Sequence, residues 1–442
     1  MKRWSSRCWW VASILFFTFW AGGATAFAEE KVPVDAGATA WMLASTALVL
    51  LMTPGLALFY GGMVRAKNVL GIAMQSFFCM GVVTIQWILV GYTLAFGESV
   101  GGGVIGSLKS HAFLSGVPYD AVFPGTKIPH MLQMAYQLMF AIITPALITG
   151  AFAERKSFNA FVVFAFLWST LVYLPLCHWV WNVDGWIYQL GALDFAGGLV
   201  VHISSGVAAL VAALYLGRRI RTESERFEPH NVTYVVLGGA LLWFGWFGFN
   251  AGSAWAANGL AVNALMVTNT AAAAASLTWL FIGWLHKGAP SVVGAVSGAV
   301  AGLVAITPAS GYVDISGALA IGFAAGGVCY GAILLRERLQ VDDALDVWAV
   351  HGVGGTLGAV LTGVFASTLV NPAVNGGGLL ESGNPQLLVN QVIAVGATWI
   401  FSGTMTFAIL KVVDLVFKVR VGEEAEIAGL DLAVHREAAY TA

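Results

Sequence analysis

The chain has 442 residues, of which 58% are hydrophobic and only 10% are charged, and its mean hydropathy is +0.80. Because a soluble domain carries about 25% charged residues, this composition excludes an ordinary soluble protein and predicts a polytopic membrane protein. The formal net charge of −2 gives no electrostatic reason to expect nucleic-acid binding. The four cysteines form no Cys-x-x-Cys pair, so neither a disulfide framework nor a zinc ribbon is indicated.

The N-terminus has the pattern of a secretory signal. Lys2 and Arg3 make a basic start, an apolar stretch follows from about Trp9, and Ala26-Phe27-Ala28 has the small residues of a cleavage site. We therefore predict a signal peptide over residues 1–28, whose removal would leave the mature N-terminus outside the cell. The alternative interpretation is an uncleaved first membrane helix.

Eleven apolar segments follow, each close to the roughly 20 residues that an α-helix needs to cross a bilayer. They cover residues 38–62, 70–96, 130–152, 158–182, 196–217, 232–252, 257–285, 291–307, 313–335, 345–367 and 388–417. The loops predicted to be cytoplasmic are basic, as the positive-inside rule requires, and they carry Arg65, Lys67, Arg155, Lys156, Arg218, Arg219, Arg221, Arg226, Lys287, Arg336 and Arg338. The loops predicted to be outside carry only Lys109 and Lys127. An odd number of spans then places the C-terminus inside.

Two histidines lie deep in apolar spans and share the local pattern Val-His-x-x-x-Gly. His202 is in the fifth span and His351 in the tenth, so the two helices run in opposite directions. An ionisable side chain is costly in hydrocarbon and is a functional hypothesis by default. The pattern predicts a 5+5 inverted repeat with a site at its interface near the bilayer midplane, and the eleventh span outside the repeat.

The histidine pattern leaves two alternatives open. The pair could be hydrogen-bonded packing residues, or it could bind a metal. Two histidines without a third ligand nearby in sequence make a poor zinc site, so no metal is expected.

Polar and aromatic residues also gather near the predicted outer ends of spans. Asp194 precedes the fifth span, where a carboxylate can cap the helix and can also lower the potential beneath a cation site. A small cation could bind to the ring faces of Phe140, Trp181 and Phe249, with Ser253 close to them in the same site. The alternative for the aromatic residues is an ordinary interfacial belt.

Taken in order from about Trp41 to the tail, the chain resembles the ammonium transporter family (Amt/MEP type, within the Amt/MEP/Rh superfamily). The segments that carry the resemblance are Gly55 to Gly62, Asp194 to Gly198 with Val201-His202, Trp246 to Ser253, Thr307 to Tyr312, and Asp346-Val347 with His351-Gly352.

The resemblance implies an all-α homotrimer with eleven transmembrane helices and one pore per subunit, which is a transporter and not an enzyme and which needs no cofactor. It implies an outer ammonium site formed by Trp181, Phe140, Phe249 and Ser253, and a gate formed by Phe140 and Phe249. It also implies that His202 and His351 line the pore and that Asp194 supports the site. The transporter domain would cover residues 29–417, in the inner membrane of a bacterium.

Ammonium would be recruited outside and cross mainly as ammonia, since an unpaired charge is costly in a dry pore. The proton would either stay behind or follow along the histidines. Two other functions remain open. One is a Rhesus-type gas channel, which would carry no ammonium current; Trp181 and Ser253 count against it. The other is an ammonium sensor that signals through its tail.

The C-terminal segment 418–442 has mixed charge and is predicted to be a cytoplasmic regulatory tail. It resembles the tail through which family members contact a trimeric PII signalling protein. Arg436 stands where glycine is usual in the family. A disordered, solubilising tail is the alternative.

Overall fold

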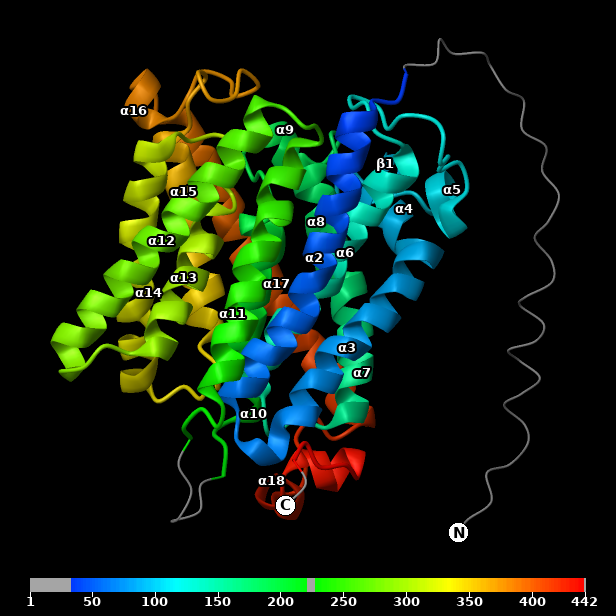
Figure 1. The fold of residues 1–442 in the computed structure, drawn as a ribbon. Coiled ribbons are helices and arrows are strands. Elements are labelled where there is room, and N and C mark those ends of the chain that lie inside the picture. The colour runs from blue at the N-terminus through cyan, green and yellow to red at the C-terminus, as the bar shows by residue number, and fades with distance from the viewer. Residues whose placement is uncertain (1–32, 221–226, 441–442) are drawn as a thin grey trace, which may run out of the picture.

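The computed structural model describes residues 33–220 and 227–440 and shows a bundle of helices that run roughly along one axis (Figure 1). In these two ranges, ten helical runs are long and apolar enough to cross a membrane. They are α2 (Ala36–Met63); α3 (Val69–Gln86) with η2 (Trp87–Gly91) and α4 (Tyr92–Phe96); α6 (His130–Ile148); α7 (Phe158–Trp168) with η5 (Ser169–Tyr173), α8 (Leu174–Trp181) and α9 (Trp186–Leu190); η6 (Gly198–Ile203) with α10 (Ser204–Leu216); α11 (Val232–Trp246) with η7 (Phe247–Ala251); α12 (Gly259–Lys287); α14 (Ile315–Leu339); η9 (Trp348–Val353) with α15 (Gly354–Phe365); and α17 (Gln386–Val416).

The eighth predicted span is a shorter apolar helix, α13 (Val292–Ile306), of 15 residues. All of its residues from 298 to 306 are buried, between neighbours that include the longer α12 and α14. Protein and not lipid therefore surrounds much of this helix, which explains why it need not match the bilayer thickness. With α13, the eleven predicted segments are all helices, and the prediction of an all-α polytopic membrane protein is confirmed. The predicted signal peptide lies outside the described residues.

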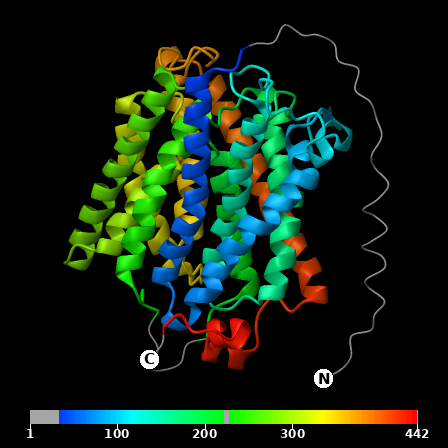
Figure 2. The same cartoon turned by 45° about the vertical axis from the view of Figure 1, so that its right-hand side comes forward.

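The remaining elements are short and lie at the two ends of the bundle. They are η1 (Ala66–Asn68), β1 (Ser99–Val100), β2 (Ile105–Gly106), α5 (Leu108–His111), η3 (Ala112–Leu114), η4 (Thr149–Phe152), η8 (Gly252–Ala254), α16 (Leu379–Ser382), α18 (Glu423–Ala428) and η10 (Asp431–His435). We call the end that carries β1, α5, α9 and α16 the loop face, and the end that carries α18 the tail face (Figures 1 and 2).

Ion pairs join the connecting segments of the tail face. Glu154, which follows α6, bonds to Arg65 at 2.8 Å, and Arg219, which follows α10, bonds to Asp342 at 2.8 Å. Both arginine side chains are about nine-tenths buried. Because removing one partner of a buried pair leaves an uncompensated charge, these contacts hold the tail-face ends of four helical runs in register.

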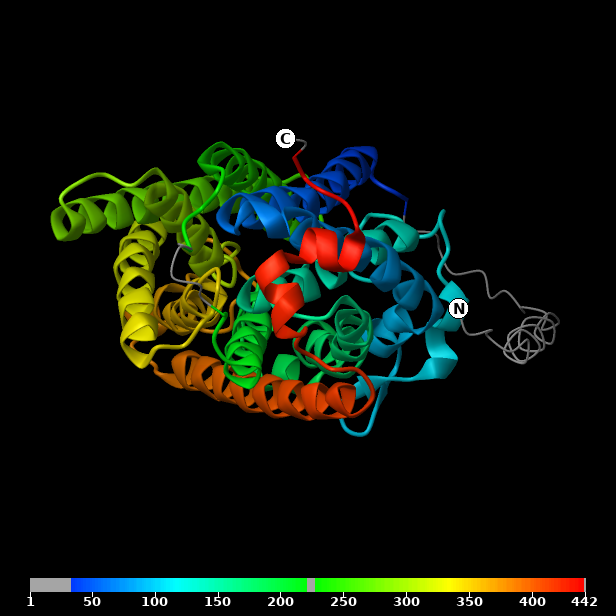
Figure 3. The same cartoon turned by 90° about the horizontal axis from the view of Figure 1, so that it is seen from below.

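The tail lies across the tail face of its own bundle, as Figure 3 shows from below. Glu426 pairs with Arg420 at 2.9 Å and accepts a hydrogen bond from the backbone N–H of Ile220. Asp431 accepts from the N–H groups of Leu70 and Gly71 at 3.0 and 2.8 Å. Those N–H groups belong to the first turn of α3 and lack a partner within that helix, so Asp431 caps it.

Arg436 ends η10 in the left-handed conformation, with φ of 60°. This backbone conformation costs a residue with a side chain about 1 kcal/mol, whereas glycine adopts it readily. The backbone at position 436 therefore has a physical preference for glycine. The chain nevertheless keeps the turn, held by the contacts of Asp431 upstream.

The two histidine helices cross in opposite directions at a pair of glycines. α10 begins near the loop face and ends at the tail face, where the Leu216 carbonyl accepts from Arg420, whereas η9 follows Asp343 on the tail face and α15 ends near Tyr312 on the loop face. A Cβ on Gly206 would lie 2.1 Å from the Gly352 nitrogen. This antiparallel crossing is the arrangement that an inverted repeat requires.

The reciprocal contact explains the shared sequence pattern. A Cβ on Gly355 would lie 3.0 Å from the Cβ of His202, and one on Gly206 would lie 2.8 Å from the carbonyl carbon of His351. Each glycine therefore stands four residues after one histidine and against the other. The pattern Val-His-x-x-x-Gly is thus the requirement that two backbones approach closely where their imidazoles meet.

Replacing Gly206 by alanine should destabilise the protein by about 1–3 kcal/mol, the cost typical of overpacking, because the added methyl group meets backbone and not a movable side chain. Thermal unfolding of the purified variant measures this. Gly331→Ala is the matched control, since nothing lies within 4 Å of a Cβ at that position in α14. Equal melting temperatures of the two variants would contradict the close crossing.

Candidate functional site

Three aromatic rings meet between α6, α8 and η7 on the loop-face side of the histidines. The ring centroids of Phe140 and Phe249 are 4.2 Å apart with an interplanar angle of 34°, and both side chains are 1% exposed. The Trp181 ring meets Phe140 edge-on, at 5.7 Å and 88°. The two phenylalanine rings therefore pack against each other in the protein interior, and the partly buried Trp181 lies beside them.

Ser253 and the neighbouring backbone supply the oxygens of this region. The Ser253 hydroxyl donates to the Phe249 carbonyl at 2.9 Å and lies 3.3 Å from the hydroxyl of Tyr136. The Tyr136 hydroxyl also lies 2.8 Å from the carbonyl oxygens of Gly248 and Phe249. Because Ser253 uses its proton on Phe249, its oxygen keeps lone pairs that can accept from a cation.

Asp194 is buried just before η6 and accepts four backbone hydrogen bonds. Oδ1 accepts from the N–H groups of Gly197 and Gly198 at 2.8 and 2.6 Å, and Oδ2 accepts from Leu199 and Val200 at 2.7 and 3.3 Å. The carboxylate thus satisfies the free N–H groups of the helix that carries His202. The carbonyl of Asp194 accepts from Trp181 Nε1 at 3.0 Å, which fixes the tryptophan ring to the same turn.

The two imidazoles meet in the centre of the bundle. His202 Nδ1 and His351 Nδ1 are 3.2 Å apart, and the two side chains are 1% and 4% exposed. His202 also stacks on Trp246, with centroids 5.4 Å apart and an interplanar angle of 26°. If one Nδ1 donates and the other accepts, each ring keeps Nε2 for another partner. Within the described residues, His202 Nε2 has no hydrogen-bond partner.

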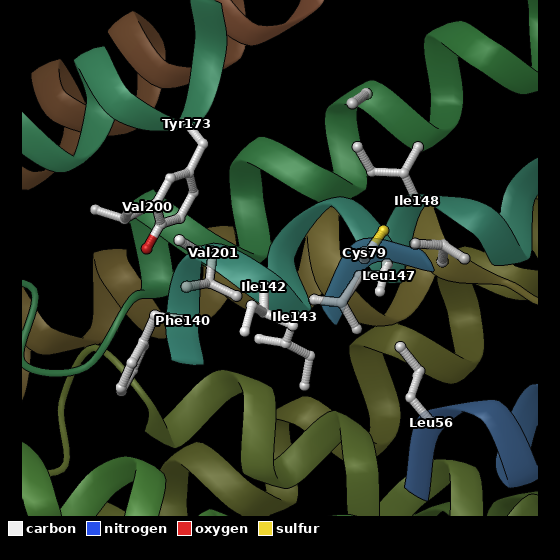
Figure 4. Packing of buried hydrophobic residues seen from close by; sticks show 14 of the residues in the cluster. Leu56, Cys79, Phe140, Ile142, Ile143, Leu147, Ile148, Tyr173, Val200 and Val201 are labelled. Atoms are coloured by element: carbon white, nitrogen blue, oxygen red, sulfur yellow. The ribbon is translucent and has the colours of Figure 1, made fainter. Parts of the chain in front are cut away.

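The histidines line a narrow cavity of about 10 Å³, which is about the smallest space that holds one water-sized molecule. Its other walls are almost entirely apolar and are formed by Met52, Leu56, Phe59, Tyr60, Ile143, Leu147, Val201, Leu242, Trp246, Phe249 and Val300. Figure 4 shows Ile143 and Val201 in this packed centre, with Phe140 on one side. The cavity beside Phe249 is therefore small and mostly apolar. Its polar groups include the two imidazoles and the Tyr60 hydroxyl.

Three of the candidate residues lie in π-helical turns. His202 is in η6, His351 in η9 and Phe249 in η7. A π turn adds one residue to the helical circuit, changes the direction of the following side chains and is frequent at functional sites. Local propensity does not predict these turns, because the packing of neighbouring helices selects them.

The structure also reveals a counterpart of Asp194 before η9, the helical segment that carries His351. Asp343 stands eight residues before His351, as Asp194 stands eight before His202. Asp343 Oδ2 accepts from the N–H of Trp348 at 2.7 Å, five residues on, as Asp194 Oδ2 does from Leu199. Burial raises the pKa of Asp343 above its usual range, and its Oδ1 has no hydrogen-bond partner among the described residues.

All seven site residues named from the sequence lie along one path. Phe140, Trp181, Phe249 and Ser253 gather toward the loop face, and Asp194 joins them through Trp181. His202 and His351 follow below, linked to the aromatic rings by a His202–Phe249 centroid distance of 6.0 Å.

Two further residues, Asp343 and Tyr136, were not predicted as site residues from the sequence. The equal eight-residue spacing to a histidine is a signal for Asp343, but the family resemblance pointed to Asp346. Asp346 instead pairs with Arg336 at 2.7 Å. Tyr136 has no such signal, since its partners are more than 100 residues away.

A bundle of membrane-spanning helices with a small, mostly apolar cavity at its centre is compatible with a transport protein. The chain belongs to the ammonium transporter family, whose model matches residues 40–440. It is 51% identical over 405 residues to an ammonium transporter of Bacillus subtilis (strain 168), covering 91% of this chain and 98% of that protein.

Solved structures agree with this assignment. Mep2 of Saccharomyces cerevisiae is similar with a TM-score of 0.81 at 38% identity, covering 88% of each chain. A sensor Amt protein is similar with a TM-score of 0.81 at 29% identity, covering 90% of this chain and 98% of that one.

Asp194→Ala should lower stability by about 1–3 kcal/mol, because it leaves four buried N–H groups without their acceptor, and it should abolish transport. Asp194→Glu keeps a carboxylate and should retain part of the flux. Thermal unfolding and uptake of labelled methylammonium into liposomes are the measurements. Wild-type flux in a well-folded Asp194→Ala protein would show that the carboxylate is dispensable.

Proposed function

We propose that this ammonium transporter recruits the ammonium ion at Trp181, Phe140, Phe249 and Ser253 and conducts ammonia past His202 and His351. The observation that carries the proposal is the contact between the two imidazoles, 3.2 Å apart between their Nδ1 atoms, in a passage otherwise lined by apolar side chains. The proton either stays outside or passes along the pair.

Recruitment rests on the aromatic rings and the oxygens around them. Ring faces attract a small cation electrostatically, by about 0.5–1 kcal/mol at an exposed site and about 2 kcal/mol where water is excluded. The Ser253 oxygen accepts a hydrogen bond from the ion. Asp194 holds Trp181 in place through its carbonyl and adds negative potential from its carboxylate.

Selection follows from the passage beneath the rings. Potassium would lose its hydration shell there and gain no fixed charge in return, which costs many kcal/mol in a medium of low dielectric constant. Ammonia is neutral, is close to water in size and can hydrogen-bond to an imidazole nitrogen. The pair thus favours a molecule that can leave its charge behind.

We assign the tail face to the cytoplasm. Arg65, Arg155, Arg219 and Arg420 all lie there, in accord with the positive-inside rule. The loop face is then outside, with the recruitment site toward it. A signal peptide over residues 1–28, a transporter domain over 29–417, a homotrimer and the inner membrane of a bacterium complete the proposal.

We further propose that the segment from Lys418 to Ala442 is regulatory and meets a trimeric PII-type signalling protein. Its docking supports this, because Asp431 caps α3 and Glu426 holds the segment after α10, so a partner that lifts the tail would release both. An ammonium sensor is the second candidate function, and the similarity to a solved sensor Amt protein supports it.

Trp181→Leu should weaken the apparent ammonium affinity about fivefold, corresponding to about 1 kcal/mol of cation–π attraction at a partly buried site. The concentration dependence of ammonium-evoked current on a supported membrane measures this. Trp186→Leu is the matched control, since the Trp186 ring contacts Trp179, with centroids 5.5 Å apart, and not the phenylalanines. An unchanged affinity in Trp181→Leu would remove this residue from the site.

His202→Asp or His351→Glu should admit potassium, because each substitution places a fixed negative charge in the passage, and His202→Ala should reduce the ammonium-driven current. Potassium-evoked current in each variant, beside wild type, is the measurement. If all three variants exclude potassium and carry normal ammonium current, the pair serves packing alone.

A third buried histidine provides the control for these variants. His178 bonds to the Ala95 carbonyl and the Ser99 hydroxyl at 2.8 and 3.0 Å, away from the pair. His178→Gln can keep such hydrogen bonds and should exclude potassium as wild type does. Potassium current in this variant would mean that leakage reports general damage and not the site.

Deleting residues 423–442 should change the ammonium flux, since the deletion removes the cap of α3 and the partner of Arg420. The intact protein should retain a PII-type protein in a pull-down under at least one nucleotide condition, and the truncated protein should not. Unchanged flux together with no retention at any nucleotide condition would leave only a solubilising role for the tail.

A further inference from the structure

A second apolar hollow, separate from the pore, lies on the outside of the bundle between α2 and α3. This groove has a volume of about 390 Å³, within the range of small-molecule sites. Its walls include Pro54 and Ala57 of α2 and Ala73, Phe77 and Met80 of α3. Phe77 is 69% exposed, so the hollow opens sideways toward whatever surrounds the spans.

The groove has the depth of one leaflet. It extends along α3 from Leu70 at the tail face to Met80, ten residues that rise about 15 Å at 1.5 Å each. That is half of the roughly 30 Å hydrocarbon thickness of a bilayer. Because the tail face is the end that holds Leu70, the groove occupies the leaflet on that side and is filled by lipid chains unless protein covers it.

Two hydroxyls in the groove lack acceptors. Thr53 and Ser76 both line the hollow and are 0% and 1% exposed. Neither Thr53 Oγ1 nor Ser76 Oγ has a hydrogen-bond partner in the described parts of the chain. A buried hydroxyl without a partner costs about 1–3 kcal/mol, so these donors call for an occupant that brings acceptor oxygens into an apolar setting.

The tail forms the mouth of the groove. His435 and Glu437 line its tail-face end, and the exposed Arg436 stands between them in the sequence. His435 is positioned by an edge-on contact with Phe158, with centroids 5.2 Å apart. The mouth therefore offers an imidazole and a carboxylate, with the exposed Arg436 between them in the sequence, and these groups complement a head group that carries both a phosphate and a cation.

We propose that this groove binds a glycerophospholipid with a primary-amine head group, phosphatidylethanolamine. Acyl chains occupy the apolar walls, ester carbonyls accept from Thr53 and Ser76, the phosphate meets His435 and Arg436, and the amine meets Glu437. The bound lipid bridges two spans and the tail, and it therefore stabilises the docked tail by mass action.

Native mass spectrometry of the purified full-length protein in detergent tests the proposal, with phosphatidylethanolamine and phosphatidylglycerol of identical acyl chains as probes. The wild type should bind phosphatidylethanolamine more tightly. Ala73→Trp fills the groove and should weaken that binding about tenfold or more. Ile85→Trp is the matched control, since Ile85 lies on the same helix in a neighbouring apolar hollow and not in this groove.

Two further variants separate the parts of the site. The combined substitutions Thr53→Val and Ser76→Ala should weaken the binding of both lipids, because both lipids carry ester carbonyls. Glu437→Gln should remove the preference for phosphatidylethanolamine, because only that lipid carries the amine.

Three results would overturn the proposal. One is equal affinity of the wild type for the two lipids, which would mean nonspecific annular lipid. A second is unchanged phosphatidylethanolamine binding in Ala73→Trp. The third is efficient cross-linking of Met74→Cys between two copies of the chain, which would mean that a second subunit covers the groove.

Discussion

A charged or unpaired polar group is costly in hydrocarbon, and the centre of this protein is arranged around that cost. His202 and His351 hydrogen-bond to one another in the middle of an apolar passage. Both carboxylate oxygens of Asp194 accept hydrogen bonds from the start of the helix that carries His202. An imidazole pair carries no fixed charge while it is neutral, yet it offers a donor and an acceptor. That combination suits a substrate that can exist as an ion outside and as a neutral molecule within.

The inverted repeat supplies the geometry that brings the pair together. Gly206 and Gly355 each remove a side chain at the point where the opposite histidine helix crosses. The same symmetry places Asp194 and Asp343 at equal distances in sequence from their histidines, each at the start of a helical segment that carries one of them. The two positions differ in what surrounds the carboxylate. Aromatic rings lie near Asp194, whereas Arg336 and the segment after η4 approach Asp343.

Much of the architecture could be predicted from the sequence, because the bilayer imposes strong rules on composition. Each predicted segment is helical, and even the short α13 falls where hydropathy placed a span. The meeting of His202 and His351 followed from a repeated pattern and from counting spans. The seven candidate residues came from the residue types and the family resemblance together, and they do lie along one path.

What the sequence missed depends on contacts between distant segments. Tyr136 bonds to carbonyl groups more than 100 residues away, and no local pattern announces such a partner. The π turns at His202, Phe249 and His351 arise from packing and not from propensity. The docking of Asp431 on α3 is likewise invisible in a tail whose composition alone is compatible with disorder.

We propose that the neutral imidazole pair, in a dry passage, lets ammonia cross and excludes ions of similar size. Ammonium and potassium concentration jumps on wild-type proteoliposomes, read by internal pH and by charge movement, test it most directly against protein-free liposomes. Ammonium should give a protein-dependent signal in at least one readout. Internal pH should change if ammonia crosses alone, and a current should appear if the proton follows. Potassium should change neither readout. A potassium current as large as the ammonium current, or an ammonium signal equal to that of protein-free liposomes, would contradict the account.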